Sequence, residues 1–118
     1  MNKSLLIAAA LVALPAMGQA AANIDAAFGN TIVSTYPDGR QAKLWLNADG
    51  TYRAQGRRGK PSSGRWALKG EQICLSQKKP VIGPFPYCTA VKSGGVGTTW
   101  IGKAVTGEKI RITLVAGR

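Results

Sequence analysis

The chain has 118 residues, of which 16 are Lys or Arg and 5 are Asp or Glu, which gives a formal net charge of +11. It contains two cysteines and no histidine, so it lacks the side chains that build most metal sites and acid–base catalytic sites. The excess of positive charge favours anionic partners, although charge alone does not identify one.

Residues 1–22 follow the pattern of a secretory signal peptide. Lys3 supplies positive charge, Leu5–Leu14 form a short apolar run, and small residues follow Gly18. The apolar run is too short for an ordinary membrane span. We therefore expect cleavage of residues 1–22 and a single domain over residues 23–118. We expect that domain to have no transmembrane segment and to be periplasmic or secreted.

After residue 23, short runs of alternating apolar and polar residues are separated by turn-forming residues, which is typical of all-β proteins. We expect an antiparallel up-and-down meander. Closure of the meander removes exposed edge strands, so it favours a closed or nearly closed β-barrel, with a two-sheet β-sandwich as the alternative. The eight expected strands lie near residues 30–36, 41–47, 51–57, 64–69, 72–77, 87–92, 98–105 and 109–115.

Hairpin turns predict the register of the strands. A three-residue loop at 48–50 keeps each face of the hairpin consistent, and it places Leu44 opposite Ala54 and Trp45 opposite Arg53. A two-residue loop at 70–71 directs four side chains of the next hairpin into the core: Trp66, Leu68, Ile73 and Leu75.

The large aromatic side chains are expected to belong to the core. Tyr52, Trp66 and Trp100 fall on strands whose apolar faces point inward. In a barrel of this length we expect them to fill the interior. A ligand pocket lined by the same residues is the alternative if the barrel is wider.

Cys74 and Cys88 are expected to form one disulfide, because an exported chain enters an oxidising compartment and the cysteine count is even. A bridge over about 15 residues contributes about 3 kcal/mol to stability. The bridge encloses Lys78–Tyr87, whose apolar tip is Val81–Phe85. We favour folding of this loop over one barrel end, with contact to a membrane or partner protein as the alternative.

The outer face of the second, third and fourth strands is the candidate binding surface. On it, Arg53 is expected to stack on Trp45 across the hairpin, a cation–π pair worth about 0.5–1 kcal/mol if exposed. The alternative is a solvated face on which long basic side chains merely cover Trp45. The candidate binding residues are Lys43, Trp45, Arg53, Arg57, Arg58, Lys60 and Arg65.

Three short motifs carry a family resemblance. They are the turn Asp49-Gly50-Thr51-Tyr52, the strand start Gly64-Arg65-Trp66, and the cysteines Cys74 and Cys88. In these motifs, residues 44–90 resemble small exported or periplasmic β-barrel proteins of uncharacterised bacterial families. The resemblance implies a lipocalin-like barrel and a periplasmic setting, and it implies no known activity.

The inventory of reactive groups points to a binding protein and not to an enzyme. The few carboxylates fall at turns or near the start of the domain, and no close pair is evident. We expect no cofactor, no metal and no nucleic-acid partner. The expected function is an exported, non-enzymatic binder of an anionic envelope component, such as a lipid headgroup, lipopolysaccharide or polysaccharide. The alternative is an inhibitor or accessory protein that acts on another exported protein through the disulfide-bounded loop.

Overall fold

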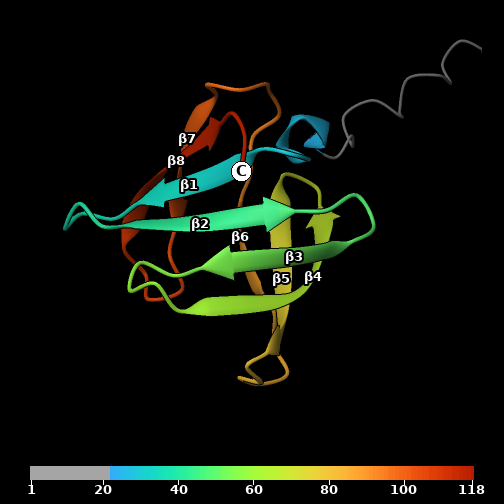
Figure 1. Ribbon diagram of the computed structural model, residues 1–118, viewed down its shortest axis with the longest axis vertical. Helices are drawn as coiled ribbons and strands as arrows, with labels where there is room; N and C mark the ends of the chain where they lie inside the picture. The colour runs from blue at the N-terminus through green and yellow to red at the C-terminus, as the bar shows by residue number, and fades with distance from the viewer. Residues whose placement is uncertain (1–21) are drawn as a thin grey trace, which may run out of the picture.

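The computed structural model describes residues 22–118, so the predicted signal peptide lies outside the described residues except for Ala22. Eight antiparallel strands form one sheet in the order β6-β5-β4-β3-β2-β1-β8-β7, curled into a nearly closed barrel (Figure 1). The predicted all-β barrel is confirmed, and the two-sheet sandwich is not observed. The elements are η3 (Asp25–Ala27), β1 (Thr31–Thr35), β2 (Gln41–Leu46), β3 (Thr51–Gln55), β4 (Pro61–Lys69), β5 (Gln72–Lys79), β6 (Tyr87–Ala90), β7 (Thr99–Lys103) and β8 (Lys109–Val115).

The predicted hairpin registers are confirmed. Leu44 pairs with Ala54 and Trp45 pairs with Arg53 across β2 and β3. In the hairpin formed by β4 and β5, Trp66 pairs with Leu75 and Leu68 pairs with Ile73. The inward side chains form one core, in which Leu46 is completely buried and Tyr52, Ile73, Ile110, Ile112 and Leu114 are nearly so.

Strands β4 and β5 are longer than predicted because a bulge separates two registers. Gly64 pairs with Gln77, whereas Ser63 pairs with Lys79, so Lys78 is skipped. The extra residue restores pairing after the bulge and extends β5 to Lys79. It also moves Lys79 onto the outer face of the sheet.

The two ends of the barrel differ. At the closed end, the N-terminal segment packs across the core, where Ile24 and Ala27 are buried and the rings of Phe28 and Trp66 lie 5.9 Å apart. The C-terminal Arg118 donates to the carbonyl of Leu46 at 2.6 Å at this same end. At the open end, the turns 36–40, 56–60 and 104–108 meet without a covering helix (Figure 1).

The edge strands β6 and β7 are joined by side chains and not by a backbone ladder within the described chain. The Tyr87 hydroxyl donates to the Lys103 carbonyl, and the Thr89 hydroxyl lies 3.2 Å from that oxygen. The Trp100 indole N–H donates to the Ala90 carbonyl at 3.0 Å. Gly102 permits this approach, since a Cβ there would lie 2.9 Å from Thr89 Oγ1.

The predicted disulfide is confirmed. Cys74 and Cys88 are directly opposite each other on β5 and β6, with their Cα atoms 4.0 Å apart. The bond attaches the four-residue strand β6 to the rest of the sheet. A disulfide is also consistent with an exported protein.

The bulge next to Gly64 has no room for a side chain, which gives a prediction about stability. A Cβ at this position would overlap the backbone carbonyl oxygen of Ser76, and backbone cannot move aside as a flexible side chain does. We expect Gly64→Ala to lower the free energy of unfolding by about 3 kcal/mol. Urea denaturation followed by tryptophan fluorescence measures it. Gly95→Ala is the control, because nothing lies within 4 Å of a Cβ there, and an equal effect of both changes would contradict the assignment.

Candidate binding surfaces

The outer face of β2 to β5 contains a shallow groove beside the predicted cation–π pair. The Arg53 guanidinium lies 5.1 Å from the centre of the Trp45 ring, which confirms the expected stacking. The Trp45 indole N–H donates to Thr31 Oγ1 at 3.0 Å, so the ring is held in place. We call this hollow of about 500 Å³ the Trp45–Arg53 groove, and it is lined chiefly by Trp45, Arg53, Pro61, Ser63, Lys79 and Pro80.

Lys79 belongs to this groove but was not among the predicted site residues. The sequence shows Lys78 and Lys79 only as the flank of the disulfide-bounded loop, because the strand was expected to end at residue 77. The bulge brings Lys79 opposite Ser63, across the groove from Trp45. A glycine that interrupts a strand, as Gly64 does, is the sequence signal that indicates such a bulge.

The placement of Arg57 on this face is wrong. Strand β3 ends at Gln55, so the alternation of faces no longer sets the direction of residue 57. The Arg57 guanidinium lies instead at the open end, 4.2 Å from the centre of the Tyr36 ring. It forms ion pairs with Asp38 at 3.8 Å and Glu108 at 3.2 Å, and thus links three hairpin turns.

The other predicted site residues are spread over the face. Lys43 precedes Trp45 by two residues on the same side of β2, opposite Gln55. Arg58 and Lys60 lie in the turn between β3 and β4, at the open end. Arg65 lies toward the closed end, where its guanidinium is 3.3 Å from the Asp49 carbonyl oxygen, and it does not line the groove. The structure therefore brings Trp45 and Arg53 together and leaves Arg65 apart.

Acidic residues do not neutralise the groove. The ion pairs found within residues 22–118 all involve Asp38 or Glu108, and their cations are Arg40 and Arg57. Neither Arg53 nor Lys79 takes part in them. The positive charge of these two side chains is therefore available to an anion from solution.

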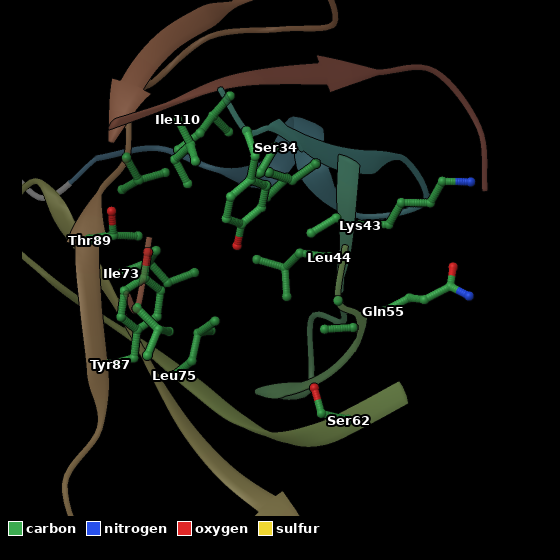
Figure 2. A pocket seen from close by; sticks show the side chains of 18 of the residues that line it. Ser34, Lys43, Leu44, Gln55, Ser62, Ile73, Leu75, Tyr87, Thr89 and Ile110 are labelled. Carbon is green, nitrogen blue, oxygen red and sulfur yellow. The ribbon is translucent and has the colours of Figure 1, made fainter. Parts of the chain in front are cut away.

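The barrel interior holds a cavity of about 160 Å³, so the expectation of a completely filled core is wrong. Figure 2 shows Leu44, Leu75 and Tyr87 around the shared space, whereas the Lys43 and Gln55 side chains point away from it. The wall is mainly aliphatic, with hydroxyl groups of Ser34, Tyr36, Tyr87 and Thr89 among its lining residues. Burial raises the pKa of Tyr36 and of Tyr87, which keeps both phenols neutral.

The disulfide-bounded loop does not close the barrel, in contrast to the favoured expectation. Val81, Ile82 and Phe85 are 85%, 65% and 86% exposed. Because β5 extends to Lys79, the loop is carried beyond the barrel, as the gold segment at the bottom of Figure 1 shows. Its apolar side chains are thus free to contact another molecule.

The link between Arg57 and Glu108 predicts a pH dependence of stability. The hydrogen bond from the Thr106 hydroxyl lowers the pKa of Glu108 from its ordinary value of 4.5, and the backbone amide of Glu108 and then the Arg57 cation lower it further. A carboxyl whose pKa is lower in the folded chain stabilises the fold above its unfolded pKa, and this contribution disappears as pH falls through the folded pKa. We therefore expect the urea midpoint to fall below pH 4.5, and to fall less in Glu108→Gln.

The measurement compares urea midpoints at about pH 7 and about pH 3 for both proteins. Glu71→Gln is the matched control, because it removes the same charge from a turn at the opposite end of the barrel. If the wild type and Glu108→Gln lost stability equally, the contribution of Glu108 would be refuted.

Comparison with known proteins gives no further guide to the site: no family model, no curated protein and no solved structure matches this chain. Among residues 22–118, no three His, Cys, Asp or Glu side chains are grouped so that they could hold a metal ion. No helix in the described part of the chain is long and apolar enough to cross a membrane.

Proposed function

We propose that this protein is an exported, non-enzymatic binding protein for an anionic component of the cell envelope. Its ligand would be a lipid headgroup, a lipopolysaccharide or an anionic polysaccharide. The observation that carries the proposal is the Trp45–Arg53 pair, fixed beside a groove whose far wall carries Lys79. The contact residues are Trp45, Arg53 and Lys79 in the groove, with Lys43, Arg58 and Lys60 beside it.

The chemistry of the groove suits a phosphate or carboxylate attached to a larger group. The Arg53 guanidinium presents several N–H donors in one plane, which matches the oxygens of such anions. The Trp45 N–H is already used by Thr31, so the ring offers only its face to a sugar or headgroup. Since Arg53 makes none of the ion pairs in residues 22–118, an anion displaces no carboxylate there.

The positions of the carboxylates support a binder over an enzyme. Asp38 and Glu108 are held by Arg57 at the open end. Asp49 accepts hydrogen bonds from the Thr51 amide and hydroxyl at 2.9 and 2.6 Å, and these bonds lower the pKa of Asp49. Groups committed to turns in this way are poorly suited to exchange protons with a substrate.

A second candidate function is supported by the loop of residues 80–86. Its exposed Val81, Ile82 and Phe85 follow two lysines, a combination that suits contact with another exported protein. In this case the protein acts as an inhibitor or accessory protein, and the basic face serves only to attract its partner.

Binding to vesicles tests the first proposal. We expect the purified protein to bind anionic vesicles with or without lipopolysaccharide, to bind neutral vesicles weakly, and to lose affinity as salt is raised. Each basic side chain near an anionic surface contributes about 1 kcal/mol, so Arg53→Ala with Lys79→Ala should weaken binding about 30-fold. Cosedimentation over a salt series measures this.

The matched control is Lys109→Ala with Arg111→Ala, which removes the same charge from exposed positions on β8. Equal weakening by both pairs would reduce the effect to net charge and contradict a specific groove. An absence of binding at low salt would refute the proposal. Vesicle binding that is lost in Phe85→Ser but kept in the groove variant would move the contact from the groove to the loop of residues 80–86.

A further inference from the structure

The cavity inside the barrel is a second feature that the outer face does not explain. We propose that it binds the hydrocarbon tail of a single-chain anionic amphiphile, of which a fatty acid carboxylate is the simplest, with the head at the open end. The cavity and the Trp45–Arg53 groove lie on opposite faces of the same sheet. Arg53 and Ser63 line only the groove and Ser34 and Trp100 only the cavity, while Ala54 and Ser62 between them border both.

The lining of the cavity selects an apolar occupant. Aliphatic side chains from four strands surround it: Ile32, Leu44, Ile73, Leu75, Ile110 and Ile112. Two of the hydroxyl groups in the lining, those of Tyr87 and Thr89, already bond to the Lys103 carbonyl. The rest of the wall is mainly aliphatic, and such a surface favours a hydrocarbon occupant.

The volume limits the size of the occupant. A cavity of 160 Å³ is close to the apolar cavity of about 150 Å³ that holds one benzene molecule, so it accommodates roughly six carbon atoms. At the closed end, Ile24 and Ala27 are buried across the core, so the cavity does not continue through the molecule. A chain end fits this blind space, whereas a two-chain lipid does not.

The open end supplies the charge for the head. The cavity lining reaches Tyr36, Gly56 and Val105, one from each of the turn regions that meet there. Val105 is an apolar rim residue with 76% of its surface exposed. The rim carries more basic side chains than its two carboxylates, Asp38 and Glu108. The basic residues of the rim are Arg40, Arg57, Arg58, Lys60, Lys103 and Lys109.

Arg57 is the rim residue best placed to meet a carboxylate. Its guanidinium already lies over Tyr36, which lines the cavity. Its contact with Asp38, at 3.8 Å, is longer than a hydrogen bond, so an incoming carboxylate can replace this partner while Glu108 remains at 3.2 Å. The apolar tail and the anionic head are thus both accommodated along one path.

Tryptophan quenching tests the location, because the tryptophans report on different faces. Trp100 lines the cavity, whereas Trp45 is on the outer face. The probe is decanoate with bromine on its terminal carbon, which quenches a tryptophan that it contacts. We expect saturable quenching that persists in Trp45→Phe and disappears in Ala54→Leu, where the larger side chain fills the cavity.

Ala67→Leu is the matched control, since it adds the same atoms on the exposed outer side of β4 and should keep full quenching. If Ala54→Leu does not fold, as judged by circular dichroism, Ser34→Leu fills the cavity from β1 instead. Quenching that is lost in Trp45→Phe and kept in the cavity-filling variant would overturn the proposal. An absence of quenching in the unaltered protein would do the same.

Calorimetry with unbrominated acids tests the size and charge of the site. Affinity should rise roughly threefold to fourfold per methylene until the tail has about six carbons and then level off, because the cavity ends. Decanol should bind more weakly than decanoate, and the difference should shrink as salt is raised. A steady rise beyond that length, or equal binding of the alcohol, would contradict the proposal.

The proposed groove on the outer face and the proposed site in the cavity can be contradicted independently of each other. Ser34→Leu should retain salt-sensitive binding to anionic vesicles, because Ser34 lines the cavity and not the Trp45–Arg53 groove. Arg53→Ala with Lys79→Ala should retain quenching by the brominated acid. If the cavity-filling variant lost vesicle binding while remaining folded, the cavity would be part of the vesicle site, and the proposal of a separate site would be overturned.

Discussion

The contact between β6 and β7 is the constraint on which the rest of the barrel depends. These two strands are the edges of the sheet, and they meet through Tyr87, Thr89 and Trp100 instead of a backbone ladder. A four-residue edge strand has few hydrogen bonds of its own, and the disulfide to β5 holds it in position. Once this seam is closed, the interior is enclosed and the turns of the open end face one another.

The electrostatic organisation of the open end follows from that closure. The turn after β7 carries Glu108, and the turn after β1 carries Asp38. Closure brings both within reach of Arg57, which lies in the turn after β3. Within residues 22–118, the two carboxylates at this end are therefore held by Arg57, with Arg40 also near Asp38, and the remaining basic side chains keep a positive rim. An anion that approaches from this side meets few competing charges.

Local sequence patterns predicted the strands correctly. They did not predict the positions of side chains that depend on contacts between distant parts of the chain. The turn at Asp49-Gly50 fixes the register that stacks Arg53 on Trp45, so this pair was predictable from a single hairpin. Arg57 was misplaced because its direction depends on Asp38 and Glu108, each contributed by a different hairpin. Lys79 was missed because the bulge depends on how closely β5 approaches Gly64.

The cavity inside the barrel also could not be predicted from the sequence. Alternation identifies which side chains point inward, but the space left between them depends on how wide the sheet curls. The core aromatics illustrate this, since Tyr52 is buried among the closed-end residues, whereas Trp100 lies against the cavity. The unfilled volume is thus a property of the closed barrel and not of any one strand.

Gly102 influences the shape of the cavity inside the barrel. A methyl group there would approach Thr89 Oγ1 to 2.9 Å and Ile112 Cδ1 to 2.7 Å. Both of these side chains line the cavity, so they would have to shift to make room. The lack of a side chain at this one residue therefore helps to set the shape of the cavity at the seam between β6 and β7.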